Sequence, residues 1–381
     1  MNRLKKGFTI VELLVVVSII ALLIAILLPA IGKARDAALI TQSLGNLRNM
    51  VAACNAYGAD YNDRQYTAVP DEVGLYGNWG AACGGIVATQ CIPQMVLGWD
   101  SGGGLWGYWI AGQAPRCASW PGTCGNFIVY QACDYWGGSW LGSWRLTNCK
   151  AFNSYVNGRY YDKAFWAPKD RITLEPVQKY FDSPVEFAFD QTNYAEPTYC
   201  WSPAAMWSPD VLSWCRRQGV TGNCQGGGTA VTARPGAAPQ SATMPGAYKS
   251  PSASMAQYPS LKWRMWEHQW LQNREGGEVN PAFNTPTPWF FNHGYNSAPA
   301  TMFFDGHTQV VSIAGIQQDN DLATSQGGKP IWFSSIAGNT DGYYSNASYD
   351  MLVYRPGAAA VAAGVATVDG ILGRDMLRIG D

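Results

Sequence analysis

The fold is decided by residues 6–32, which read KGFTIVELLVVVSIIALLIAILLPAIG. Twenty consecutive residues beginning at Leu13 carry no charge, which is about the length that a helix needs to cross a hydrocarbon core of ~30 Å. Arg3, Lys5 and Lys6 precede this run. Positive charge before a span predicts that this end stays in the cytoplasm and that the remainder is translocated. We therefore expect a membrane-embedded N-terminal helix.

Two simpler explanations of this segment are less favoured: an ordinary secretory signal fits poorly, and a plain membrane anchor is possible but leaves one residue unexplained. The apolar region of an ordinary secretory signal is about 7–15 residues long and ends at a small-residue cleavage site, whereas this run continues directly into a helical pattern. A plain membrane anchor does not explain Glu12, because a carboxylate carried to the bilayer centre costs about 2.5 kcal/mol or more. Glu12 therefore needs a cationic partner.

Residues 6–14, KGFTIVELL, resemble the class III signal of type IV prepilins and type II secretion pseudopilins. The resemblance implies that a prepilin peptidase cuts between Gly7 and Phe8 and methylates the new N-terminus on Phe8. It also implies that Glu12 pairs with the N-terminal amine of a neighbouring subunit and sets the axial register of a filament. Pro29 lies where many pilins have a helix-kinking proline, and the kink is either a point of extension under load or a tolerated bend.

The family fold is a long N-terminal helix packed on an antiparallel β-sheet, so we expect an α+β, pilin-like protein. Beyond Pro29, apolar residues recur at spacings of 4, 3, 4 and 3, which predicts that one face of the helix packs on the sheet. These residues are Ile40, Leu44, Leu47, Val51 and Cys54. The opposite face carries Gln42, Asn46, Arg48 and Asn49. We expect three parts: a leader (1–7), a transmembrane and assembly helix (8–58) and an extracellular globular head (59–381).

The cysteines subdivide the head. An even number in a translocated chain predicts up to five disulfides, and the absence of any CxxC pair argues against a zinc ribbon. The ten cysteines are Cys54, Cys83, Cys91, Cys117, Cys124, Cys133, Cys149, Cys200, Cys215 and Cys224. Cys54 has a second interpretation, a free thiol buried on the apolar face of the helix. We expect a disulfide-rich, loop-rich insertion over about 75–225, a linker over about 222–260 and a Cys-free part over about 261–381.

Strand signals dominate after residue 298. Residues 299–304 and 307–313 flank Asp305-Gly306, which predicts a β-hairpin with a type I′ turn. With His293 upstream, the segment is similar to the His-spacer-Asp-Gly motif of large planctomycete-type prepilin-like proteins. Eleven residues separate His293 from Asp305, where the usual spacer is nine. A structural histidine beside the hairpin is the favoured interpretation of His293.

Two sets of tryptophans occur at helical spacing. The first set, Trp263, Trp266 and Trp270, predicts a helix over 261–271 that packs into the core, with a ligand platform as the less favoured alternative. The second set, Trp136, Trp140 and Trp144, stands among glycines. It has two interpretations, core packing or a surface platform on which sugar rings stack.

Composition excludes other classes of function. The chain has 381 residues, of which 47% are hydrophobic and 14% charged, with a net charge of −1. Disorder is excluded by the apolar content, and we expect no nucleic-acid partner because no basic stripe exists. No P-loop, dinucleotide fingerprint, HExxH or GxSxG motif occurs, so we expect no enzyme, no catalytic residue and no metal or other cofactor. Calcium is the one metal ion that we consider, because acidic residues in loops could bind it. The favoured interpretation of these residues is that they lie in solvated turns: Asp60, Asp63, Asp319 and Asp321.

The expected function is that of a structural subunit of a type IV pilus-like extracellular filament. Its partners are further copies of itself, the prepilin peptidase, an inner-membrane assembly platform and, before assembly, the membrane. The precursor is expected in the inner membrane and the mature chain on the cell surface. Two alternatives remain open: a type II secretion pseudopilin, or a membrane-displayed adhesin that binds glycans through its Trp-rich head.

Overall fold

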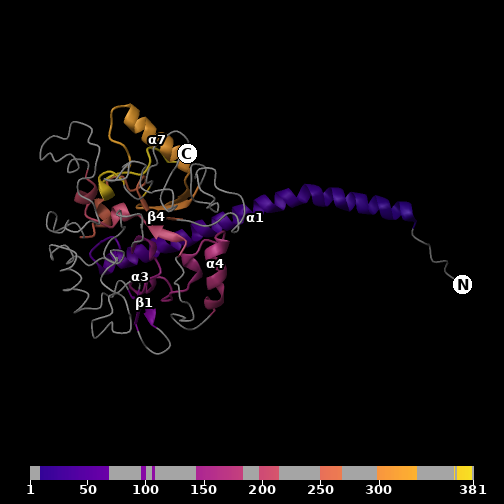
Figure 1. Cartoon of the computed structure of the whole chain (residues 1–381), viewed down its shortest axis with the longest axis horizontal. Coiled ribbons are helices and arrows are strands. Elements are labelled where there is room, and N and C mark those ends of the chain that lie inside the picture. Colours follow the sequence, from indigo (N-terminus) through magenta and orange to yellow (C-terminus); the bar gives the residue numbers. More distant parts are fainter. Residues whose placement is uncertain are drawn as a thin grey trace, which may run out of the picture.

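The computed structural model describes residues 9–67, 96–99, 105–107, 143–182, 197–213, 249–267, 298–332, 364 and 367–379. Its dominant element is helix α1, Ile10–Asp60, whose first half projects from the head and whose second half lies against it (Figure 1). The expected combination of a long N-terminal helix and an antiparallel sheet is therefore confirmed.

Helix α1 is built from a strong start signal and a long apolar sequence. Thr9 is the N-cap and Glu12 the third helical residue, and together they form a capping box. The helix is 51 residues long and is apolar enough to cross a membrane by length and composition. It runs through Pro29 without interruption, and the projecting part curves gently in Figure 1. A functional kink at Pro29 stays a prediction.

The head contains a four-stranded antiparallel sheet in the order β3-β4-β5-β6. The strands are β3 (Tyr199–Trp201), β4 (Trp263–Glu267), β5 (Ala300–Phe303) and β6 (Thr308–Val310). Cys200 is paired with Trp266, Met265 with Met302 and Thr301 with Gln309, and the register of β4 on β5 shifts between Trp263 and Met265. A second, separate antiparallel pair joins β1 (Val96–Trp99) to β2 (Leu105–Gly107). One sheet thus combines a strand of the expected Cys-rich part with three of the Cys-free part.

The remaining described elements are short, apart from α7. The α-helices are α3 (Lys150–Asn153), α4 (Arg171–Val177) and α7 (Ile313–Ser325). The 3₁₀ helices are η5 (Ser143–Arg145), η6 (Lys163–Phe165), η7 (Gln178–Tyr180), η8 (Pro203–Ala205), η9 (Pro209–Leu212), η10 (Ala253–Met255) and η11 (Gly370–Leu372). In Figure 1, α7 and the C-terminus lie at the top of the head, away from α1.

Tryptophan dominates the core of the head. Among the described residues, six indole side chains are fully buried: Trp144, Trp166, Trp201, Trp207, Trp263 and Trp332. The expected helix over 261–271 is wrong, because residues 263–267 form strand β4. All five residues of β4 are buried, so both faces of the strand are covered and tryptophans at a spacing of three can occupy opposite faces. Their helical spacing was therefore misleading. The interpretation of Trp144 as part of a surface platform is wrong, because this residue is buried and its ring centroid lies 6.1 Å from that of Trp266. Trp136, Trp140 and Trp270 lie outside the described residues.

The predicted β5–β6 hairpin is confirmed, but its turn is not type I′. Gly306 has a φ of 87°, whereas Asp305 is not in the left-handed region. The amide of Gly306 donates to the carbonyl of Phe303 at 3.0 Å, and the amide of Phe303 donates to the carbonyl of His307 at 3.0 Å. These bonds enclose a three-residue loop that ends in a left-handed glycine, the common alternative to the two-residue turn.

The described cysteines form no disulfides. Cys54, Cys149 and Cys200 are buried thiols that form no disulfide, which corrects the expectation of bridges at these three positions. Each thiol is held in a different setting: Cys54 lies on α1, Cys149 contacts the hydroxyl of Tyr66, and Cys200 donates to the carbonyl of Trp266 at 3.5 Å. The other seven lie outside the described residues: Cys83, Cys91, Cys117, Cys124, Cys133, Cys215 and Cys224.

Candidate assembly site along helix α1

The N-terminal end of α1 holds a carboxylate in a fixed position. The Oε2 atom of Glu12 accepts from the amide of Thr9 at 2.9 Å and from its hydroxyl at 2.7 Å, while the amide of Glu12 donates to Thr9 Oγ1 at 3.3 Å. Negative charge is stabilised at this end of a helix, where free amides point outward. The predicted processing residues, Gly7 and Phe8, lie outside the described residues. Glu12 is therefore presented beside the predicted new N-terminus, at the tip of the projecting helix.

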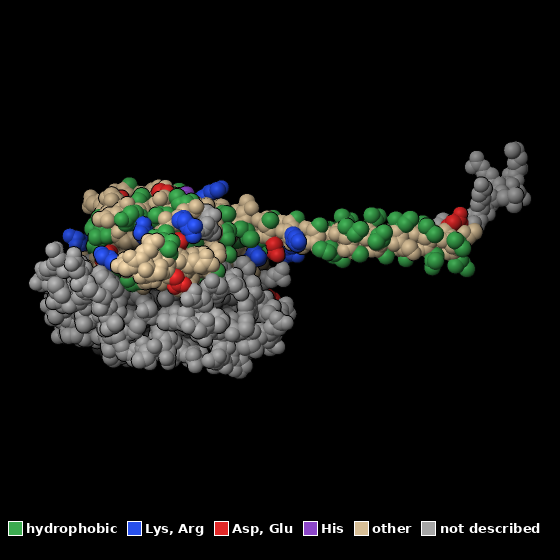
Figure 2. All heavy atoms as spheres, turned by 90° about the horizontal axis from the view of Figure 1, so that it is seen from above, with side chains coloured by type: hydrophobic (Ala, Val, Ile, Leu, Met, Phe, Trp, Pro, Cys, Tyr) green, Lys and Arg blue, Asp and Glu red, His purple; other side chains and the backbone are tan. Residues whose placement is uncertain are grey.

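The projecting half of α1 is an uninterrupted apolar surface (Figure 2). Every large apolar side chain between Ile10 and Ile31 is exposed, Ile10 by 85%. Water-exposed apolar surface of this extent indicates a membrane or protein partner. These residues are Ile10, Val11, Leu13, Leu14, Val15, Val16, Val17, Ile19, Ile20, Leu22, Leu23, Ile24, Ile26, Leu27, Leu28 and Ile31.

From Ser43 onward, one face of α1 is covered by the head. The buried residues are Ser43, Leu47, Met50, Ala53, Cys54, Tyr57 and Gly58. Of the predicted stripe, Leu47 and Cys54 are buried, whereas Ile40, Leu44 and Val51 are half-buried. Asn46, which was expected on the solvent face, contacts the head. The centre of the packed face is thus rotated from the predicted stripe, because polar contacts contribute to it alongside the apolar ones.

These polar contacts form a cluster that we call the helix clamp: Ser43 and Asn46 of α1 with Tyr199 of β3 and Glu267 of β4. Ser43 Oγ lies 2.7 Å from the Tyr199 hydroxyl and donates to Glu267. Asn46 Nδ2 donates to the carbonyl of Trp166 at 3.2 Å. Because buried polar groups are costly when unpaired, this pattern is satisfied at one axial and rotational position of the helix.

The protonation state of Tyr199 suits this clamp. Burial raises the pKa of the Tyr199 hydroxyl far above its ordinary value, and the nearby Glu267 carboxylate raises it further. The tyrosine therefore stays neutral, able both to donate and to accept. Glu267 also accepts from the amide of Ala300 at 2.9 Å, which links the clamp to strand β5. The clamp was missed from the sequence, where its only signal is the pair Ser43 and Asn46 at a spacing of three on an otherwise apolar face.

The Asp-Gly turn of the β5–β6 hairpin also rests on α1. A Cβ atom at Gly306 would lie 3.1 Å from Cγ1 of Val51, so the glycine permits a close approach as well as a positive φ. Asp305 Oδ1 accepts from the amide of His307 at 3.1 Å, and the ring of His307 stacks on Phe303 with centroids 4.1 Å apart. Asp305 and Gly306 are thus turn and packing residues, while His293 lies outside the described residues.

The acidic residues considered for calcium are separately hydrogen-bonded. Asp60 accepts from the hydroxyl of Tyr155 at 2.6 Å, and Asp63 accepts from the amide of Ser254 at 3.0 Å. Asp319 accepts from the amide of Leu377 at 2.7 Å and Asp321 from Gln317 at 3.2 Å. No group of three or more metal-binding side chains occurs in the described part of the chain.

Comparison with known proteins is informative about the N-terminal region. Residues 2–28 match the family described as the prokaryotic N-terminal methylation motif. The chain is also 34% identical over 107 residues to the type IV wide pilus major component PilA4 of Thermus thermophilus. That match covers 27% of this chain and 80% of the relative. No solved structure matches the chain.

Proposed function

The chain belongs to the family of type IV pilins and pseudopilins, and on this premise we propose that it is a structural subunit of a type IV pilus-like extracellular filament. The observation that carries the proposal is the projecting half of α1, an exposed apolar surface from Ile10 to Ile31 with Glu12 at its tip. The naming of its relative as a major pilus component supports a pilin over a secretion pseudopilin.

In this proposal the chain has a leader (1–7), an assembly helix (8–58) and an outward-facing head (59–381). Prepilin peptidase cleaves between Gly7 and Phe8 and methylates Phe8. The apolar half of α1 is held in the inner membrane until an assembly platform extracts it. It then packs against the same surface of neighbouring copies, so contacts with lipid are replaced by contacts with protein and little apolar surface meets water.

In this proposal, Glu12 sets the axial position of each subunit relative to its neighbours. In the structure its Oε2 atom takes both bonds from Thr9, which leaves Oε1 available to a neighbouring chain. Within a filament core, an unpaired carboxylate would be destabilising, whereas pairing with the new amine of a neighbouring subunit removes that penalty. Only one axial offset between neighbours provides the pairing.

The test is to express Glu12→Ala and Glu12→Gln in cells and count sheared filaments by electron microscopy. We expect both variants to insert into the membrane and to lose filaments, because neither can pair with the amine. Glu175→Gln, which changes an exposed carboxylate of the head, is the matched control and should assemble normally. Normal filaments from both Glu12 variants would contradict the proposal.

A further inference from the structure

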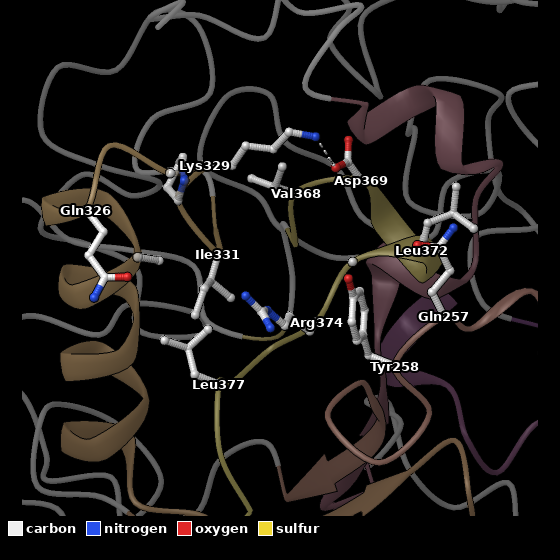
Figure 3. Close-up of a pocket in the computed structure, with 14 residues that line it drawn as sticks. Gln257, Tyr258, Gln326, Lys329, Ile331, Val368, Asp369, Leu372, Arg374 and Leu377 are labelled. Atoms are coloured by element: carbon white, nitrogen blue, oxygen red, sulfur yellow. Dashed lines mark hydrogen bonds and ion pairs between the residues drawn. The ribbon is translucent and has the colours of Figure 1, made fainter. Parts of the chain in front are cut away.

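A pocket opens on the head between the end of α7 and the C-terminal segment (Figure 3). Its volume is about 490 Å³, within the ~300–1,000 Å³ that is typical of ligand sites. Gln326 and Lys329 border it on the side of α7, Tyr258 on the opposite side, and residues 368–377 lie between them. The pocket lies beside α7, which is at the top of the head in Figure 1 and away from the projecting half of α1.

The pocket carries an excess of positive charge. Its charged lining residues are Lys329, Arg374 and Asp369. Lys329 Nζ lies 3.0 Å from Asp369 Oδ2, which neutralises that pair. Arg374 forms no ion pair within the described part of the chain; its guanidinium carbon lies 5.3 Å from the ring centroid of Tyr258. The guanidinium is therefore held by an aromatic ring, with its planar set of donors available to an anion.

The other walls suit a sugar ring. Tyr258 is 42% exposed, so part of its ring is accessible beside the guanidinium. The buried side chains of Ile331 and Val368 provide an apolar base, and the amides of Gln257 and Gln326 provide donors and acceptors at the rim. An exposed aromatic face beside hydrogen-bonding amides matches a pyranose, which has apolar C–H faces and a belt of hydroxyls.

We propose that this pocket binds an acidic saccharide, with the sugar carboxylate paired to Arg374 and the ring placed against Tyr258. The cation of Arg374 selects a carboxylate-bearing sugar over a neutral one. A saccharide is favoured over an acidic peptide because the two amides at the rim match the belt of hydroxyls around a sugar ring, and the exposed face of Tyr258 matches its C–H face. The inference goes beyond filament formation and is independent of it.

The probe is trigalacturonic acid, titrated calorimetrically into the full-length chain in a polyoxyethylene detergent that carries no sugar. Its fully methyl-esterified form is the matched neutral ligand, and triglutamate is the peptide arm. We expect the free acid to bind and the ester to bind about tenfold more weakly, because the ester lacks the charge that pairs with Arg374; tenfold in affinity corresponds to ~1.4 kcal/mol.

Variants assign the binding to this pocket. Arg374→Gln should lower affinity for the free acid by about tenfold and Tyr258→Ala by about fivefold, with Arg374→Lys intermediate because an ammonium lacks the planar fork. Arg378→Gln is the control: Arg378 lies outside the pocket, on the same segment, and pairs with Asp319 at 3.5 Å. No binding of the free acid, equal binding by the ester, undiminished binding by both folded Arg374 variants, or preference for triglutamate would overturn the proposal.

Discussion

Replacing Gly306 with alanine tests how the sheet is seated on α1. Gly306 has a φ of 87°, and a Cβ atom there would lie 3.1 Å from Val51 Cγ1. The left-handed conformation costs an L-residue about 1–2 kcal/mol, and overpacking at a close contact adds about 1–3 kcal/mol. We therefore expect Gly306→Ala to lower the free energy of unfolding by about 2–5 kcal/mol.

A matched glycine separates the two contributions. Gly327 has a φ of 72°, and a Cβ atom there would meet no atom of the described chain within 4 Å. Gly327→Ala should therefore cost only the conformational ~1–2 kcal/mol. The excess cost of Gly306→Ala over Gly327→Ala measures the contact between the hairpin and α1.

The assay is urea unfolding of the full-length chain in detergent micelles, followed by tryptophan fluorescence, which reports on the Trp-rich head. In a Val51→Ala background, the methyl group that opposes the new Cβ is absent, so the excess cost of Gly306→Ala should fall below about 0.5 kcal/mol. Equal costs for the two glycine variants, or an excess unchanged by Val51→Ala, would refute the placement of the Asp-Gly turn on α1.

Three further predictions concern buried groups of the head. Asp375→Ala should lower the free energy of unfolding in urea by about 3–5 kcal/mol, because it leaves the fully buried Lys262 without its carboxylate partner. In the structure, Lys262 Nζ lies 2.9 Å from Asp375 Oδ2. A loss of less than about 1 kcal/mol would contradict the buried ion pair. Burial raises the pKa of Asp170 from 3.8 to about 6, so its contribution to stability is complete below about pH 4 and is lost as the pH rises through 6. Between about pH 4 and 7, the free energy of unfolding of the wild type should fall, and that of Asp170→Asn should fall less. Urea midpoints that change in parallel for the two chains over this range would contradict the raised pKa of Asp170. Burial raises the pKa of the Cys54 thiol, and that of the Cys149 thiol to about 11. Iodoacetamide should therefore label both cysteines only after the chain is unfolded. Rapid labelling of the folded chain would show that the thiols are exposed, and a need for reductant before labelling would show that they are bridged.

The features that the sequence predicted correctly are those encoded by neighbouring residues. The α1 helix was predicted from its uncharged apolar run, which is a local signal, and the structure adds a capping box at its start. The β5–β6 hairpin follows from two apolar segments around Asp305-Gly306. Even there, the turn lies against Val51, which is distant in sequence, and the predicted type I′ turn is wrong.

The features that sequence reasoning missed depend on tertiary contacts. Strand β4 has tryptophans at a helical spacing, but burial on both faces permits apolar residues at any position. The helix clamp joins Ser43 to Tyr199 and Glu267, and such pairings of remote residues leave no pattern in one sequence. That Cys149 and Cys200 form no disulfide likewise reflects where the fold places each thiol rather than the parity of the cysteine count.

The central claim is that the chain is processed at Gly7 and assembled outside the cell through α1. The most direct measurement is the intact mass of the subunit in filaments sheared from the cell surface. We expect an abundant chain that lacks residues 1–7 and carries one additional methyl group on Phe8. A chain that keeps Met1, or one absent from the sheared fraction and confined to the envelope, would contradict it.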